Sequence, residues 1–349
     1  QQQQQQQQQQ QGVAFSILAG FRTSRPALAP HAAAARQAAE ASRIALVVPG
    51  LLYGGSSYEE MCAEMRQRGY QTCAVPMEWW HWLPCLGGRS VRPVLERIDY
   101  AVDHLLAHGA DEPVPAPSYS FSDLITDFMS NPGGALAVGG SSDPDAFPAT
   151  QPCGADFSQE ARALRKQPAD KDAPLRVALV GHSAGGWISR IFLSCIPYGG
   201  RAYHGVKRVH SLVTLGSPHQ NAPGVAFKSI DWMERKAPVL REEDGFSVRC
   251  LAVGSTGTPL ASASDFTKGS YKFCGASSDG EADGDGVTPL FSALAMLGAD
   301  KLTLDGVTHA PDYPSVGPTA ELQRARAAGM PWYGSPSALE RWLPWLKEG

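Results

Sequence analysis

Short, uninterrupted apolar runs recur along the chain, each bounded by turn-forming or polar residues. The first covers residues 43–50 and reads Arg-Ile-Ala-Leu-Val-Val-Pro-Gly. Such runs are typical of strands buried in a parallel sheet. Further strands are predicted at residues 71–75, 175–180, 209–215, 248–254 and 301–304.

Between these runs, apolar residues recur at the spacing of helices that bury one face. For the first helix, Ser57 is the expected N-cap, Glu60 completes a capping box, and Gly69 ends the helix. Strands that alternate with helices imply an α/β fold, with a mostly parallel sheet flanked by helices in one domain over residues 43–349. The predicted helices cover residues 58–66, 93–108, 121–129 and 187–195.

Two parts of the chain break this alternation. Residues 1–42 begin with a polyglutamine tract, which cannot build a packed core and is expected to be disordered. From residue 12 to residue 39 there is no acidic residue, and arginines lie among Ala, Ser and Pro, as is typical of an organelle transit peptide. A merely disordered, alanine-rich N-terminus is the alternative. Residues 110–173, rich in Pro, Ala, Ser, Gly and Asp, predict a partly disordered surface insertion.

Composition narrows the function classes. The formal net charge is −4, and no basic face or stripe that would bind nucleic acid is visible. The seven cysteines are odd in number and none are spaced as Cys-x-x-Cys, which argues against a zinc site or a dense disulfide framework. We therefore expect buried thiols in a reducing compartment and no metal site. No apolar run approaches the roughly 20 residues that span a bilayer.

Residues 181–185 carry the motif with the clearest chemistry, Gly-His-Ser-Ala-Gly. An apolar strand precedes it and a helical stretch follows, as expected for a nucleophilic serine on a strained strand-to-helix turn. Glycines flank the serine because side chains at those positions would collide with the strand and the helix. The helix N-terminus favours negative charge that develops near the serine. Ser183 is therefore the predicted nucleophile.

Four motifs together resemble the lipase and lipid-acyltransferase branch of the α/β-hydrolases. They are Val-Val-Pro-Gly at 47–50, Gly-His-Ser-Ala-Gly-Gly at 181–186, Gly-Ser-Pro-His at 216–219 and Gly-Asp-Gly-Val-Thr-Pro at 284–289. The resemblance covers residues 43–310 and implies the α/β-hydrolase fold. Residues 76–82, Pro-Met-Glu-Trp-Trp-His-Trp, are also similar to uncharacterised plant and algal plastid hydrolases. That likeness and the N-terminal composition imply a chloroplast location, with the mitochondrion or the cytoplasm as alternatives.

A nucleophilic serine needs a base, and the base needs an orienting carboxylate. In α/β-hydrolases the order along the chain is serine, acid, histidine. His309 is the expected base because it alone follows the last predicted strand. Asp285, in a glycine-flanked turn, is the expected acid, with Asp283 and Asp279 as rivals and a merely solvated acidic loop as the alternative. The other histidines that follow Ser183 are His204, His210 and His219.

Two backbone N–H groups are expected to form an oxyanion hole. One belongs to Ala184, directly after the nucleophile, and the other comes from the turn after the first strand. The resemblance to lipases implies Leu51 as the second donor, with Leu52 as the alternative. Lipases more often carry His-Gly where this chain has Pro49-Gly50, but a backbone donor is unaffected by that change.

Substrate contacts are expected from four side chains: Leu52, His182, Trp80 and Trp232. Trp232 lies in residues 217–247, a mixed apolar and charged segment between two strands, where a lid often sits. Trp80 belongs to an aromatic run that is expected to line an acyl channel or to touch a membrane. Ordinary core or lid packing is the alternative for both tryptophans. The apolar and charged C-terminal residues 339–346 favour either peripheral membrane contact or docking on the domain.

These observations predict a serine esterase or lipase. It would cleave a lipid-like carboxylic ester through an acyl-enzyme, without a metal or an organic cofactor. One alternative is a lipid acyltransferase that uses the same three residues. The other is a catalytically silent binding protein with the hydrolase fold.

Overall fold

The computed structural model describes residues 43–110, 112–116, 120–130, 176–222, 228–277, 280–310 and 328–347. The described residues all belong to one compact unit, residues 39–349. The predicted disordered segment at residues 1–42 lies outside the described residues. Most of the predicted insertion at 110–173 also lies outside them, but its predicted helix is present.

The described strands form one fully parallel sheet in the order β2-β1-β3-β4-β5-β6. Every run that predicted a strand is a strand. The four strands in the middle of the sheet are buried along nearly their whole length, whereas the strand at residues 300–305 is largely exposed. The chain reverses its direction of travel across the sheet between β1 and β3, and ligands of open α/β sheets bind beyond the carboxyl ends of strands at such a point. The strands are β1 (Ile44–Val48), β2 (Gln71–Ala74), β3 (Val177–His182), β4 (Val209–Leu215), β5 (Arg249–Thr256) and β6 (Asp300–Asp305).

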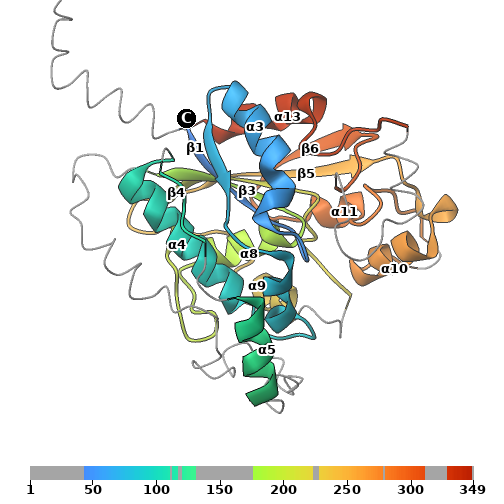
Figure 1. Ribbon diagram of the computed structural model, residues 1–349. Coiled ribbons are helices and arrows are strands. Elements are labelled where there is room, and N and C mark those ends of the chain that lie inside the picture. Colours follow the sequence, from blue (N-terminus) through green and yellow to red (C-terminus); the bar gives the residue numbers. More distant parts are fainter. Residues whose placement is uncertain are drawn as a thin grey trace, which may run out of the picture. The chain divides into compact units, whose positions relative to one another are not determined.

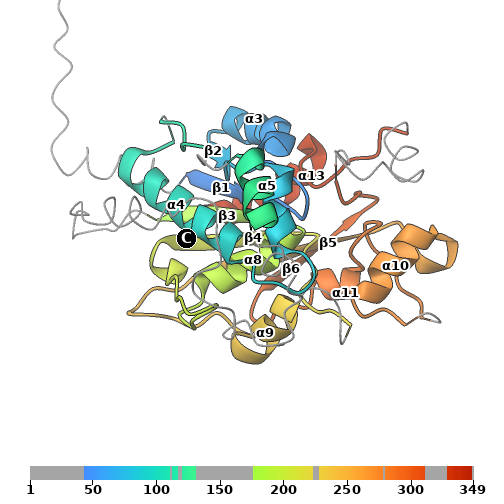
Figure 2. The same ribbon diagram turned by 60° about the horizontal axis from the view of Figure 1, so that its bottom comes forward.

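Helices cover both faces of this sheet (Figures 1 and 2). The α-helices are α3 (Glu59–Gln67), α4 (Arg92–His108), α5 (Phe121–Ser130), α8 (Ala184–Leu193), α9 (Lys228–Lys236), α10 (Asp265–Phe273), α11 (Leu290–Ala293) and α13 (Pro336–Trp342). Short 3-10 helices are η1 (Gly55–Tyr58), η2 (Trp79–Cys85), η4 (Gly205–Lys207), η5 (Leu260–Ser262) and η6 (Leu343–Leu346).

Two apolar clusters lie on opposite faces of the sheet, and β1 contributes to both. Leu46 and Val48 belong to the cluster that includes α4 and α8. Ala45 and Val47 belong to the cluster that includes α3 and α13. Successive strand residues point to opposite faces, so a strand buried on both sides must be apolar throughout. This is the physical reason why the strands appear in the sequence as continuous apolar runs.

Buried ion pairs join α4 to the segment before β4. Arg208 lies 2.7 Å from Asp99 and also contacts Asp103, while Arg201 contacts both Glu96 and Asp99. The carboxylates of this cluster are buried. Each therefore depends on its arginine partners, since an unpaired buried charge is costly.

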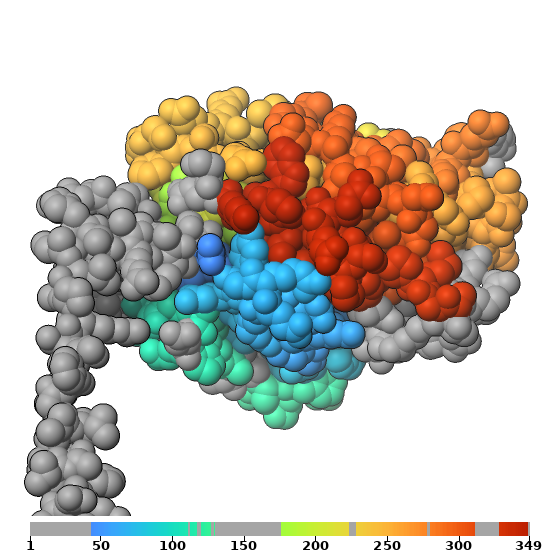
Figure 3. Space-filling model, turned by 90° about the horizontal axis from the view of Figure 1, so that it is seen from above, coloured from blue at the N-terminus to red at the C-terminus, as the bar shows by residue number. Residues whose placement is uncertain are grey.

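The C-terminal elements pack beside α3, although they are far from it in sequence (Figure 3). The Tyr70 hydroxyl donates to the Leu343 carbonyl at 3.1 Å. The Trp342 indole N–H donates to the Tyr333 carbonyl at 2.9 Å. These contacts hold the segment that contains Tyr333 against the sheet.

The predicted capping box at Ser57 is wrong. Ser57 lies inside η1, and the N-cap of α3 is Tyr58, whose side chain makes no capping bond. The 3-10 turn continues directly into α3, so no extended residue is left for a serine cap. The predicted end of the helix is confirmed, because Gly69 follows it with a φ of 85°. None of the helices in the described part is both long and apolar enough to cross a bilayer.

We predict that Asp99→Ala lowers the free energy of unfolding by about 3–5 kcal/mol, because Arg201 and Arg208 each lose one of their two carboxylate partners in the buried cluster. The measurement is urea denaturation followed by circular dichroism. Glu59→Ala is the matched control, because the Glu59–Arg66 pair is exposed and should change stability by less than about 1 kcal/mol. Equal effects of the two substitutions would contradict a structural role for the buried cluster.

Candidate active site

Ser183 occupies a strained turn between β3 and α8. Its φ is 51° and its ψ is −123°, a conformation that residues with a Cβ rarely adopt. Such strain costs about 1–3 kcal/mol and persists only where the surroundings enforce it. The Ser183 N–H donates to the Leu215 carbonyl at 2.9 Å, which fixes the turn to the carboxyl end of β4.

Two glycines after Ser183 let α8 approach the sheet closely. A Cβ on Gly185 would lie 2.2 Å from the carbonyl oxygen of Val48 in β1. A Cβ on Gly186 would lie 1.8 Å from the Ser217 hydroxyl oxygen. Neither distance leaves room for a side chain, so the glycines of the motif have the steric role that the sequence indicated.

A tight turn after β1 lies against the serine. Tyr53 N–H donates to the Gly50 carbonyl at 3.1 Å, and Leu52 has a φ of 62°. The Gly50 N–H donates to the Tyr58 hydroxyl at 2.8 Å. The Gly50 and Tyr53 donors are therefore engaged inside the protein, and the turn has the N–H groups of Leu51 and Leu52 left to offer a ligand.

The turn is close enough to Ser183 to act with it. A Cβ added to Gly50 would lie 2.9 Å from the Ser183 Cβ. Ala184 is the first residue of α8, and the first N–H groups of a helix have no acceptor within that helix. The structure thus brings both predicted oxyanion donors, Leu51 and Ala184, to the same side chain, whereas their role in catalysis stays a prediction.

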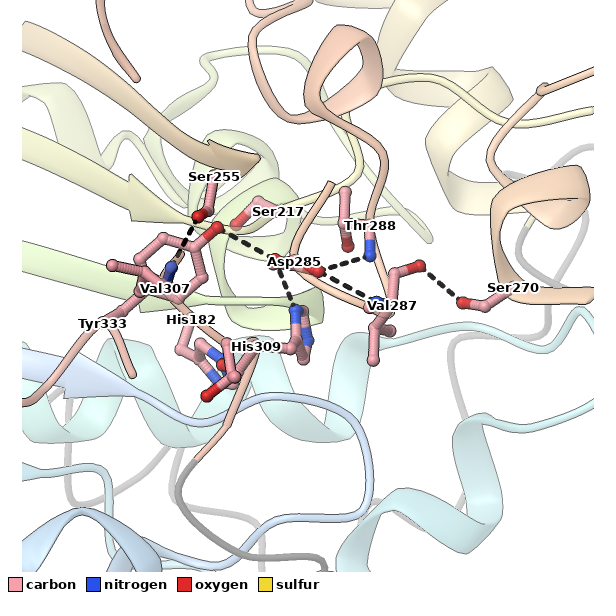
Figure 4. Close-up of polar contacts among 12 residues, drawn as sticks. His182, Ser217, Ser255, Ser270, Asp285, Val287, Thr288, Val307, His309 and Tyr333 are labelled. Carbon is pink, nitrogen blue, oxygen red and sulfur yellow. Dashed lines mark hydrogen bonds and ion pairs between the residues drawn. The ribbon is translucent and has the colours of Figure 1, made fainter. Parts of the chain in front are cut away.

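Asp285 and His309 meet in a buried hydrogen-bonded pair (Figure 4). His309 Nδ1 lies 2.8 Å from Asp285 Oδ2. The His309 N–H also donates to the Asp285 carbonyl at 3.0 Å, so both the side chain and the backbone of the two residues are paired. The rival Asp283 instead accepts the N–H groups of Gly257 and Gly284, and Asp279 lies outside the described residues.

Four donors surround the buried Asp285 carboxylate. Oδ1 accepts the N–H groups of Val287 and Thr288 at 2.9 and 2.7 Å, and Oδ2 accepts from His309 and from the Tyr333 hydroxyl at 2.9 Å. Burial by itself would raise the pKa of Asp285, but His309 and the backbone N–H groups outweigh burial and hold the pKa below its usual value. Asp285 is therefore charged at neutral pH and can orient an imidazole.

His182 links the β1 turn to the backbone of His309. Its Nε2 lies 2.7 Å from the His309 carbonyl, which can only accept, so Nε2 carries the proton. Nδ1 then accepts from the Tyr58 hydroxyl at 2.7 Å. Burial lowers the pKa of His182 to about 3, with the neighbouring His309 adding to the effect. A neutral His182 thus completes a continuous chain of hydrogen bonds from Gly50 to His309.

The remaining histidines after Ser183 are engaged elsewhere or buried away from it. His219 Nδ1 accepts from Arg190 at 3.2 Å, and its Nε2 lies 3.1 Å from the Thr214 hydroxyl. His204 pairs with Glu243. His210 is buried near the start of β4, at the opposite end of the strand from Leu215. Of the four histidines that follow Ser183, only His309 lines a cavity together with Ser183.

That cavity has a volume of about 580 Å³, within the usual range for small-molecule sites. Leu51, Leu52 and Trp187 line it together with Ser183, and Ile230 of α9 also contributes. Residues of α10 form another part of the wall. The lining is mostly apolar, so the cavity suits an uncharged, hydrocarbon-rich ligand.

The expected substrate contacts fall into two groups. Leu52 lines the cavity. His182, Trp80 and Trp232 do not line it, and their contact with a substrate stays a prediction. The reason they do not line it is packing: His182 is fully buried in its hydrogen bonds, and the Trp232 ring lies edge-on to Tyr198 in the core, with 5.0 Å between ring centroids. Trp80 packs against Phe121 at the start of α5.

The candidate lid at 217–247 contains α9. Ile230, Trp232 and Met233 of this helix are buried in the same core cluster as α8. Residues 223–227 lie outside the described residues, and a lid function for the segment stays a prediction.

Sequence reasoning missed Tyr333, Tyr58 and the α10 wall. Tyr333 follows Asp285 by 48 residues and Tyr58 precedes His182 by 124 residues, so no local spacing connects either tyrosine with its partner. Helix α10 does carry a detectable signal, because Phe266 and Phe273 are two helical turns apart. Within the described residues, no group of three His, Cys, Asp or Glu side chains is arranged to hold a metal ion.

We predict that His182 binds no proton in the folded protein until the pH falls near 3. The unfolded chain takes up that proton near its ordinary pKa of 6.5, so this residue makes stability fall as the pH drops from 6.5, by at most about 1.4 kcal/mol per pH unit. Denaturation at pH 7 and pH 5 measures the loss, which should be smaller in His182→Gln than in wild type. An imidazole NMR signal of folded His182 that titrates near 6.5 would contradict the prediction.

The chain is similar to known proteins over part of its length. A family model described as "PGAP1-like alpha/beta domain" matches residues 162–232, which include β3, the Ser183 turn, α8 and β4. Among solved structures, the crystal structure of tomato methylketone synthase I complexed with 2-tridecanone matches at 15% identity with a TM-score of 0.21. That match covers 58% of this chain and 49% of the tomato chain, so it spans about half of that protein. No curated protein sequence matches the chain. With its parallel sheet, flanking helices and strand-turn-helix serine, the chain has the α/β-hydrolase fold.

Proposed function

We propose that the protein is a serine hydrolase that cleaves a carboxylic ester with a hydrocarbon-rich substituent. The observation that carries this proposal is the shared cavity of Ser183 and His309, in which Ser183 sits on a strained turn and His309 is paired with Asp285. A strained serine, an imidazole and a buried carboxylate in this arrangement are the parts that acyl transfer requires. The apolar lining favours an ester over a charged substrate.

The reaction would proceed in two halves. Ser183 Oγ attacks the ester carbonyl while His309 takes the hydroxyl proton, and Asp285 stabilises the resulting imidazolium. The negative oxygen of the tetrahedral intermediate accepts hydrogen bonds from the backbone N–H groups of Leu51 and Ala184. His309 then protonates the leaving alcohol, and an acyl-enzyme is formed. Water, deprotonated by His309, attacks the acyl-enzyme and releases the acid and free Ser183.

We predict that a fluorophosphonate probe labels the wild-type protein and that Ser183→Ala abolishes the labelling. Mass spectrometry of the digested protein should place the adduct on the peptide that contains Ser183. Ser262→Ala is the matched control, because this serine is exposed in η5 and does not line the cavity. Absence of labelling in a folded wild-type protein would contradict the proposal and favour a silent binding protein.

Graded losses are expected around Asp285. Asp285→Asn should lower kcat by about 10⁴-fold, because the amide favours the wrong imidazole tautomer. Tyr333→Phe removes one of four hydrogen bonds and should lower kcat by about tenfold, which corresponds to roughly 1.4 kcal/mol. Hydrolysis of p-nitrophenyl butyrate measures both effects. Equal losses in the two variants would mean that Tyr333, rather than the charge of Asp285, dominates the orientation of His309.

The same acyl-enzyme could pass its acyl group to an alcohol instead of water. Adding a long-chain alcohol to the p-nitrophenyl ester assay separates the two outcomes by product. Free acid as the main product supports the hydrolase. A predominant new ester would show that the protein is an acyltransferase.

A further inference from the structure

Helix α10 presents one face to the cavity. Phe266, Gly269, Ser270 and Phe273 all line it, and their spacing of three, four and seven residues places them on one side of the helix. The exposure of these residues falls along the helix: Phe266 and Gly269 are exposed, whereas Ser270 and Phe273 are half-buried. The α10 wall therefore leads from solvent to the interior of the cavity.

Gly269 leaves a gap in this wall. A Cβ built on Gly269 would meet no atom within 4 Å, so no neighbour requires a glycine there. Its backbone is helical and not left-handed, and glycine in the interior of a helix is less stable than alanine. Neither packing nor backbone geometry explains this glycine. What it does is open a notch between Phe266 and Phe273.

The wall around the notch is fixed in place by hydrogen bonds. Thr267 Oγ1 donates to the Gly286 carbonyl at 2.8 Å, and Ser270 Oγ donates to the Val287 carbonyl at 2.6 Å (Figure 4). The Tyr271 hydroxyl accepts the Gly286 N–H at 3.1 Å. All three bonds tie α10 to the turn that carries Asp285. A side chain added at Gly269 should therefore fill the notch rather than push the helix away.

We propose that the notch at Gly269 holds the hydrocarbon chain of the substrate where the chain leaves the cavity, and so sets the chain length that the site accepts. This inference rests on the proposed ester hydrolysis, of which it names the chain-binding site. Aromatic carbons of Phe266 and Phe273 flank the notch, and such surfaces favour methylene groups over water. The neighbouring Asp265 carboxylate also lines the cavity and disfavours an anionic group there. The chain can belong to the acyl group or to the alcohol.

The test fills the notch with Gly269→Leu and compares kcat/KM for long and short esters. One arm uses p-nitrophenyl laurate and butyrate, which vary the acyl chain. The other arm uses dodecyl acetate and butyl acetate, which vary the alcohol. One of the two arms varies the chain that is bound in the notch. In that arm, the ratio of kcat/KM for the long ester to kcat/KM for the short ester should fall by about tenfold or more, because the displaced methylene groups lose their contacts.

Two control variants separate filling of the notch from the general effects of a larger side chain on α10. Lys268→Leu adds the same side chain one position earlier, on a residue that does not line the cavity, and should leave both ratios unchanged. Gly269→Ala should raise the urea midpoint of unfolding, because alanine favours the helix, while it changes the ratios much less than leucine does. A ratio within twofold of wild type for Gly269→Leu in both arms would overturn the proposal.

A binding measurement separates failure of the notch from failure of the chemistry. In the Ser183→Ala background, calorimetry with 1-dodecanol should show binding that Gly269→Leu weakens by about tenfold or more. If wild type hydrolyses no ester but this loss is seen, the proposed function is wrong and the chain-binding site stands. Unchanged dodecanol binding in the leucine variant would count against the notch, whatever the enzyme hydrolyses.

Discussion

A carboxylate without solvent access holds the candidate site together. Asp285 is buried, and a charge in that position is tolerable only when its oxygens are fully hydrogen-bonded. Its four donors come from its own turn, from the loop after β6 and from Tyr333 before α13. Three distant segments must therefore be docked before the carboxylate can be charged. The ordering of His309 is thus a consequence of folding as a whole.

The serine imposes a second constraint on the site. Ser183 keeps its unfavourable backbone conformation because α8 lies directly on the sheet, an approach that Gly181, Gly185 and Gly186 permit. The buried pair of Tyr58 and His182 joins this turn to the β1 turn and to the His309 backbone. The predicted nucleophile, oxyanion donors and base are therefore held by one connected set of buried bonds.

The walls of the cavity differ in how they are held. Near Ser183 they are formed by α8 and by the β1 turn, which are part of the central core. Helix α10 lies outside the two large apolar clusters and is attached mainly through the acid turn. A change in α10 can consequently alter what the cavity accepts while the sheet and the reacting groups keep their positions. This separation is what makes chain length a property that can be tested independently of the chemistry.

The sequence by itself determined the strands and the serine turn, because both are encoded locally: doubly buried strands must be apolar throughout, and the Ser183 turn needs its own glycines. It also indicated His309, through its place after the last strand. Only the tertiary structure showed that His309 pairs with Asp285 and not with Asp283. It also placed Tyr58 and Tyr333, and it buried Trp232 and His182 away from the cavity. Those outcomes depend on partners tens of residues away, and no local periodicity carries the geometry of such a contact.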